Sequence, residues 1–183
     1  MTKMLGRDEL LSALVAMDDE LGRRRIKAEL FIVGGAAMAL AYDSRRSTAD
    51  MDAVFAPSDV VREVAELVAR ELDLEPNWLN DGAKAYIPGE DPDRIGVFEG
   101  SFLSVAAASP RFLLAMKLLA SRAQRDKDDI VHLYELCGFT TVNEGLDLLE
   151  QYYPQRLILP RVQLLLQELL QDRGIDGGRG HTL

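Results

Sequence analysis

The sequence predicts an α+β fold, a mixed β-sheet with flanking helices followed by a C-terminal helical bundle. Two observations predict it. Up to residue 109, short apolar runs typical of strands alternate with segments of helical periodicity, which indicates a sheet with helices on one face. From Pro110 onward every segment has helical spacing. We therefore predict a first domain over residues 1–109, a helical region over 110–176 and a flexible tail over 177–183.

The first domain combines three predicted helices with short strands. A helix is expected from Asp8, near its N-cap, to Gly22 at its C-terminus. Alanine-rich residues 36–42 predict a second helix, and a third runs from the candidate N-cap Ser58 to about Leu72. Apolar runs between turn residues predict the strands. They are Leu30 to Val33, Asp50 to Phe55, Trp78 to Leu79, Lys84 to Ile87, Ile95 to Phe98 and Phe102 to Ala107.

The second half contains four segments with apolar residues at helical spacing. Gly138, Pro154 and Gly174 are expected to end them. The predicted helices are Arg111 to Ala123, Lys127 to Cys137, Val142 to Tyr153 and Leu159 to Gln171.

Composition limits the classes of function. The net charge of −9 over 183 residues argues against a broad nucleic-acid-binding surface. Three compact basic clusters, Arg23 to Arg25, Arg45–Arg46 and residues 122–127, still allow a local basic surface. No apolar run approaches the roughly 20 residues needed to span a bilayer, and no signal-peptide pattern is present. With a single cysteine, Cys137, we expect a cytoplasmic protein without membrane contact.

The first candidate site lies between Glu29 and Phe55. An apolar run leads into Gly34–Gly35 and a helical segment, and the next strand carries Asp50 and Asp52. Because strand side chains alternate faces, these two carboxylates share one side and one small volume. Such a pair favours a cation between its members, and oxygen ligands favour Mg²⁺ or Mn²⁺. Glycines allow close backbone approach and a helix start attracts phosphate, so the layout suits metal-assisted phosphoryl or nucleotidyl transfer.

This arrangement resembles the signature of the DNA polymerase β-type nucleotidyltransferase superfamily, in which a strand ends in two glycines and a helix leads to a strand with Asp-x-Asp. The likeness extends to the AbiEii-like toxins of bacterial toxin–antitoxin systems. Their spacing is matched by Gly34 to Leu40, Arg46, Thr48, Asp50 and Asp52. The resemblance implies a nucleotidyltransferase fold, an NTP substrate, Mg²⁺ or Mn²⁺ held by the aspartates, tRNA as acceptor and a cognate antitoxin as partner. In this interpretation Gly34, Gly35 and Thr48 line the phosphate path, and Arg46 neutralises the triphosphate.

A second constellation lies in the helical half. From the residues alone, Lys117 is a lysine whose stem packs on an apolar helix while its charge reaches solvent. Asp126 and Asp129 can be explained by N-capping and by compensation of the helix dipole at the start of the next helix. A second AbiEii-like signature is matched by Lys117, Ala120, Arg122, Arg125, Asp126, Asp129 and Leu133. The resemblance implies that Lys117 reaches the NTP phosphates and that Asp126 is an active-site acid.

One departure from the superfamily affects the expected activity. Many polymerase β-type enzymes carry a third carboxylate on a later strand, and here the strand after Arg94 offers only Glu99, at its end. Either Glu99 or Asp126 would have to supply it. Three hypotheses follow: a toxin that transfers an NMP to tRNA, an enzyme that modifies a small-molecule hydroxyl such as that of an antibiotic, and a catalytically silent nucleotide-binding module.

Overall fold

In the computed structural model the chain forms two compact units, Met1–Ser109 and Pro110–Leu183. The structure describes residues 3–120, 123–158 and 160–172. The predicted tail over 177–183 lies outside the described residues, as do Arg122 of the second signature and Leu159 and Gly174 at the ends of the last predicted helix.

The first unit is built on a five-stranded mixed sheet with the strand order β3-β2-β1-β5-β4. The strands are β1 (Ala28–Val33), β2 (Met51–Ala56), β3 (Leu79–Asn80), β4 (Ile95–Glu99) and β5 (Leu103–Ala107). β1 pairs antiparallel with β2 and parallel with β5. β2 and β3 are parallel, whereas β4 and β5 are antiparallel. The predicted α+β mixed sheet is therefore confirmed.

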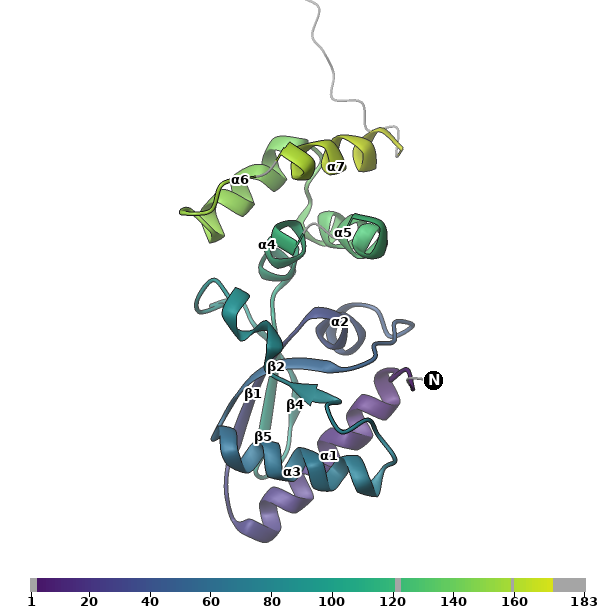
Figure 1. Ribbon diagram of the computed structural model, residues 1–183, viewed down its shortest axis with the longest axis vertical. Coiled ribbons are helices and arrows are strands. Elements are labelled where there is room, and N and C mark those ends of the chain that lie inside the picture. Colours follow the sequence, from purple (N-terminus) through teal and green to yellow (C-terminus); the bar gives the residue numbers. More distant parts are fainter. Residues whose placement is uncertain (1–2, 121–122, 159, 173–183) are drawn as a thin grey trace, which may run out of the picture. The chain divides into compact units, whose positions relative to one another are not determined.

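One face of the sheet is covered by α1 (Arg7–Arg24) and α3 (Ser58–Glu71), as Figure 1 shows. The strand residues that point to these helices are apolar and buried. They include Leu30, Ile32, Met51, Ala53, Leu103 and Val105. Residues at alternate positions point to the other face. α2 (Gly34–Ala37) follows β1 directly and continues as a π-helix over Met38–Tyr42, which confirms the predicted helix there.

Two predicted features of the first unit are wrong. Gly22 does not end α1, because the glycine lies inside the helix against Phe102, where an added Cβ would come 3.1 Å from the ring. The predicted strand from Lys84 to Ile87 is a 3₁₀-helix, Gly82–Tyr86. Side-chain contacts hold this turn, since the Gly82 N–H donates to Asn80 Oδ1 at 2.9 Å and Asp81 pairs with Arg62 at 2.6 Å.

Other boundaries shift by a residue or a turn. Ser58 is the first residue of α3 and Pro57 is its N-cap. Asp50 precedes β2 instead of lying within it, and the third strand is Leu79–Asn80, with Trp78 before it.

The second unit contains α4 (Pro110–Ala120), α5 (Ala123–Cys137), α6 (Val142–Tyr152) and α7 (Pro160–Gln171). Its core is apolar and includes Phe112, Leu118, Leu133, Leu149 and Leu166. Gly138 follows α5 with a φ of 69°, a conformation suited to a helix end, so its predicted role is confirmed. Among the helices of the described residues, none is long and apolar enough to cross a membrane.

Asp18, on α1, holds the turn between β4 and β5. Its carboxylate accepts hydrogen bonds from the backbone N–H groups of Ser101 at 3.1 Å and of Phe102 and Leu103 at 2.7 Å. Gly100 in this turn has no room for a side chain, because a Cβ would overlap the Asp18 carboxylate. One side chain therefore fixes where the β4–β5 hairpin meets the helical layer.

We expect Asp18→Ala to lower the free energy of unfolding by about 2–3 kcal/mol, because three backbone N–H groups lose their charged acceptor. Urea denaturation measures the change. The matched control is Asp19→Ala, at the exposed neighbouring position, which should stay within about 0.5 kcal/mol of the parent protein. Equal losses in the two variants would show that Asp18 does not hold the turn.

Candidate functional site

The first candidate site begins where β1 passes into α2. Gly34 has a φ of 65°, in the left-handed region that favours glycine. Gly35 faces a different constraint, because a Cβ there would lie 2.6 Å from Thr48 Oγ1 and 2.9 Å from Thr48 Cβ. The first glycine is thus required by the turn and the second by close packing. Gly34 leaves bare backbone at the end of β1, whereas Thr48 covers the Cβ side of Gly35.

Thr48 connects this glycine turn to the aspartates. The N-terminal segment fixes its backbone, since Leu5 N–H donates to Thr48 O at 2.7 Å and Thr48 N–H donates to Leu5 O at 2.9 Å. The Thr48 hydroxyl donates to the backbone oxygen of Asp50 at 3.0 Å. A contact between residues distant in sequence therefore sets the position of the segment that carries Asp50.

Asp50 and Asp52 stand on either side of Met51 at the start of β2. Met51 is fully buried, and Asp52 points to the opposite face of the sheet. The register of β1 and β2 pairs Asp52 with Val33, the residue before the glycine turn. As a result, Asp52 Oδ2 lies 3.5 Å from the position of a Cβ on Gly34. The structure therefore brings the glycine pair, Thr48 and the aspartates together.

Asn80 also belongs to this site, although it was not predicted from the sequence. β3 runs parallel to β2 and sets Asn80 beside Asp52. The Asn80 side-chain amide donates to Asp50 Oδ2 at 3.3 Å, while its oxygen accepts from Gly82. Asn80 therefore orients Asp50 and anchors the following 3₁₀-helix. The only sequence signal is the turn Asn80-Asp81-Gly82, which does not reveal the pairing with β2.

Arg46 lies in the turn before the aspartates. Its Nε is 3.7 Å from Asp43 Oδ2, and its side chain is 34% exposed. The neighbouring Arg45 donates from its backbone and side chain to Asp43, and these hydrogen bonds lower the pKa of that carboxyl. Asp43 therefore contacts both arginines of the turn and restricts their positions. The role of Arg46 toward a triphosphate stays a prediction.

Glu99 lies at the other end of the sheet from Asp52. Asp52 pairs with Val33, at the last residue of β1, whereas Glu99 pairs with Ser104, whose partner is Glu29 near the first residue of β1. Glu29 and Val33 are four residues, and therefore about 13 Å, apart along β1. Glu99 is therefore excluded as the third carboxylate of this site. Within the described residues, no cluster of three or more Asp, Glu, His or Cys side chains could hold a metal ion.

The second unit contains an ion-pair cluster that joins α4 to α5. Lys117 Nζ lies 3.0 Å from Asp126 Oδ1 and 2.8 Å from Asp129 Oδ2, and the three side chains are only 12–16% exposed. The interpretation of Lys117 as a solvent-reaching lysine is therefore wrong. Asp126 is not an N-cap, because α5 begins at Ala123, but it lies in the first turn of α5, where a negative charge compensates the helix dipole as the same interpretation expects. The roles that the resemblance implies for Lys117 and Asp126 stay predictions.

Comparison with known families decides the class. The sequence model of a family described as nucleotidyltransferases of unknown function (DUF6036) matches residues 9–155. The chain belongs to this family. The matched region of this DUF6036 nucleotidyltransferase contains both the glycine–aspartate site and the Lys117 cluster. Searches of the curated proteins and of the solved structures found no match.

We expect Gly35→Ala to destabilise the protein by about 1–3 kcal/mol, because the new methyl group overlaps Thr48, whose backbone Leu5 holds in place. Thermal unfolding measures the effect. Gly96→Ala is the control, since nothing lies within 4 Å of a Cβ at that position. If both variants melt at the temperature of the parent, Gly35 is not required by packing.

A separate prediction concerns Lys117→Ala, which should cost about 3 kcal/mol of stability because two largely buried carboxylates lose their cation. Adding Asp126→Asn to this variant should restore part of the loss by removing one uncompensated charge. Lys127→Ala is the matched control, because its pairs with Glu168 and Asp172 lie at the surface, where solvent screens them, and it should lower the stability much less than Lys117→Ala. Similar losses for both lysines, measured by urea denaturation, would contradict a structural role for Lys117.

Proposed function

We propose that this protein is a metal-dependent nucleotidyltransferase that moves an NMP from an NTP to an acceptor hydroxyl. The observation that carries the proposal is the meeting of the Gly34–Gly35 turn with Asp50 and Asp52 at the junction of β1 and β2. Membership of a nucleotidyltransferase family supports the reaction class.

The glycine turn is suited to the phosphates. Gly34 carries no side chain, so a phosphate can approach its backbone closely, and the N–H groups of the helix that begins at Gly34 and Gly35 attract negative charge. Thr48 packs against Gly35 and lines the same phosphate path. Arg46, in the adjoining turn, carries a positive charge that can offset part of the triphosphate charge.

The carboxylates suit Mg²⁺ or Mn²⁺. Asp50 and Asp52 offer oxygen donors, and Asn80 holds the carboxylate of Asp50 in one orientation. Mg²⁺ sites commonly use one or two carboxylates together with substrate phosphates and water, so this pair fits without a third acid. A bound ion would stabilise the negative charge that develops on the transferred phosphate.

In the proposed transfer the acceptor oxygen forms a bond to the α-phosphorus of the NTP. The bond from that phosphorus to the oxygen that bridges to the β-phosphate breaks. Pyrophosphate leaves with the electron pair, and the hydroxyl proton passes to solvent. When the acceptor hydroxyl is held near the α-phosphate of the bound NTP, the two substrates no longer have to meet by diffusion. The entropy lost in such an encounter is otherwise a large part of the barrier.

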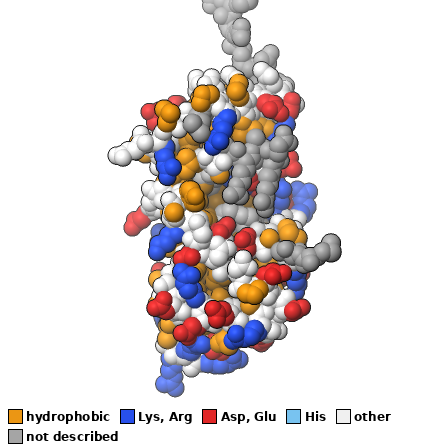
Figure 2. Space-filling view, in the orientation of Figure 1, with side chains coloured by type: hydrophobic (Ala, Val, Ile, Leu, Met, Phe, Trp, Pro, Cys, Tyr) orange, Lys and Arg blue, Asp and Glu red, His pale blue; other side chains and the backbone are white. Residues whose placement is uncertain are grey.

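Two classes of acceptor are proposed. The resemblance to AbiEii-like toxins supports tRNA, in which case the protein would be a toxin with an antitoxin as partner. A small-molecule hydroxyl is supported by the net charge of −9. On the face seen in Figure 2, acidic side chains are interspersed among the basic ones and do not leave a continuous basic stripe.

We expect Asp50→Asn and Asp52→Asn each to lower NMP transfer by about 100-fold or more, because each loses a metal-binding charge at nearly constant volume. The assay uses NTPs radiolabelled in the α-phosphate, Mg²⁺ or Mn²⁺, and either total tRNA or small hydroxyl compounds. Asp59→Asn, at an exposed position on α3, is the matched control and should keep full activity.

Melting temperatures establish whether each aspartate variant is folded. Full activity in both would overturn the site assignment. Metal-dependent NTP binding by the parent protein, with no transfer to any acceptor, would identify a catalytically silent module.

A further inference from the structure

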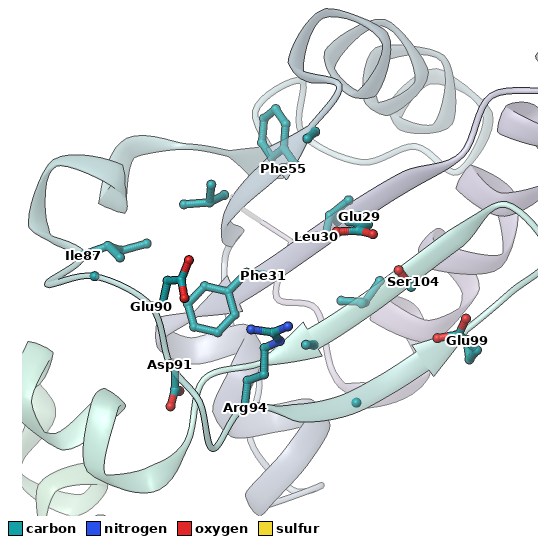
Figure 3. Close-up of a pocket in the computed structure, with 16 residues that line it drawn as sticks. Glu29, Leu30, Phe31, Phe55, Ile87, Glu90, Asp91, Arg94, Glu99 and Ser104 are labelled. Atoms are coloured by element: carbon teal, nitrogen blue, oxygen red, sulfur yellow. The ribbon is translucent and has the colours of Figure 1, made fainter.

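A cavity of about 590 Å³ lies on the sheet face that α1 and α3 do not cover. Its floor includes Phe31 of β1, Val54 of β2 and Ala106 of β5, and the segment 87–94 forms a wall beside it, as Figure 3 shows. This volume falls within the range of about 300–1,000 Å³ that is usual for small-molecule sites. An apolar floor of this kind can hold a ring or a short carbon skeleton.

The charged side chains around the cavity are mainly acidic. Glu29, Glu90 and Glu99 line it together with a single cation, Arg94. In Figure 3, Glu90 and Arg94 lie on either side of the Phe31 ring, and Glu29 lies further along the sheet. Within the described residues, none of these four side chains forms a hydrogen bond or an ion pair with another residue. With three carboxylates and one guanidinium, these four side chains give the lining of the cavity a net negative charge.

Asp91 has a different role in the same wall. Its carboxylate is buried and accepts hydrogen bonds from Ser109, from the N–H at 2.7 Å and from the hydroxyl at 3.0 Å. Figure 3 shows Asp91 pointing away from the Phe31 ring. Asp91 therefore fastens the wall to the end of β5, and the neighbouring Glu90 is left to face the cavity.

The cavity adjoins the aspartate pair. Val54 and Asp52 lie on the same face of β2, two residues and about 7 Å apart. Along β1, Phe31 at the cavity is followed by Val33 at the level of Asp52, and then by the glycine turn. The carboxylates thus stand between the proposed phosphate path and the cavity. A molecule in the cavity could present a hydroxyl to the α-phosphate from this side.

We propose that the cavity binds the acceptor, and that this acceptor is a small hydroxyl compound carrying one or more ammonium groups. The inference rests on the transfer function proposed above and names the class of its second substrate. Carboxylates around an apolar floor attract organic cations, whereas they repel the phosphates of a nucleotide or of RNA. The negative charge thus separates the acceptor from the NTP.

The test measures binding of three six-membered cyclitols to the full chain without NTP, by calorimetry and backbone amide NMR. The probes are 2-deoxystreptamine with two ammonium groups, neutral myo-inositol, and anionic myo-inositol 1-phosphate. We expect 2-deoxystreptamine to bind at least about tenfold more tightly than myo-inositol, with its affinity falling as salt is raised. Shifts of the Phe31, Glu90 and Arg94 amides should locate it in the cavity.

Charge variants test the source of the preference. The double variant Glu29→Gln, Glu90→Gln should weaken 2-deoxystreptamine binding by about fivefold or more. Glu66→Gln, which removes an exposed carboxylate on α3, is the matched control and should leave the affinity unchanged. Glu90→Lys should move the preference toward myo-inositol 1-phosphate.

Several outcomes would overturn the inference. They are equal binding of 2-deoxystreptamine and myo-inositol, or tighter binding of myo-inositol 1-phosphate than of 2-deoxystreptamine. A third is that an NTP shifts the amides around the cavity and 2-deoxystreptamine does not. Because binding is measured without NTP, the two proposals fail separately. Cation binding without transfer upholds the ligand class and overturns the transfer function, whereas transfer to tRNA without cation binding overturns the ligand class alone.

Discussion

The antiparallel pairing of β1 with β2 is the constraint on which the candidate site depends. It sets Val33 opposite Asp52, so that the chain leaves β1 through the Gly34 turn beside a carboxylate. Burial fixes this register, because Met51 and Ala53 fill the core face. A slip of one residue would turn Asp52 into the apolar core and expose Met51, at the cost of burying a charge.

Contacts from distant parts of the chain hold this junction. Leu5 fixes the backbone of Thr48. Thr48 in turn packs against Gly35 so closely that no residue with a side chain fits at position 35 without a shift. From the other side, β3 brings Asn80 to Asp50. Each of these contacts restricts a residue of the proposed site, and the hydrogen bond from Asn80 orients the carboxylate of Asp50 without any ligand.

The charges of the Lys117 cluster are paired inside the protein, whereas those of the carboxylates at the cavity are not. In the second unit, Lys117 is held by two carboxylates, which offset the cost of burying its ammonium group and fasten α4 to α5. In the first unit, Glu29 and Glu90 line a cavity and form no ion pair with any described residue. Charges matched inside the protein stabilise the fold, whereas unmatched charges at a cavity remain available to a ligand. This difference supports a structural role for the Lys117 cluster.

The sequence by itself determined the mixed sheet, the helical second half and the spacing of Gly34, Gly35, Asp50 and Asp52, because periodicity and residue type act over a few residues. Tertiary structure decided what depends on strand order and packing. Strand pairing places Asn80 beside Asp52 and Glu99 at the far end of the sheet from Asp52. Packing against Phe102 places Gly22 inside α1. It also gave Lys117 its partners. These contacts join residues far apart in the chain, and a local pattern carries no information about which distant segment will become its neighbour.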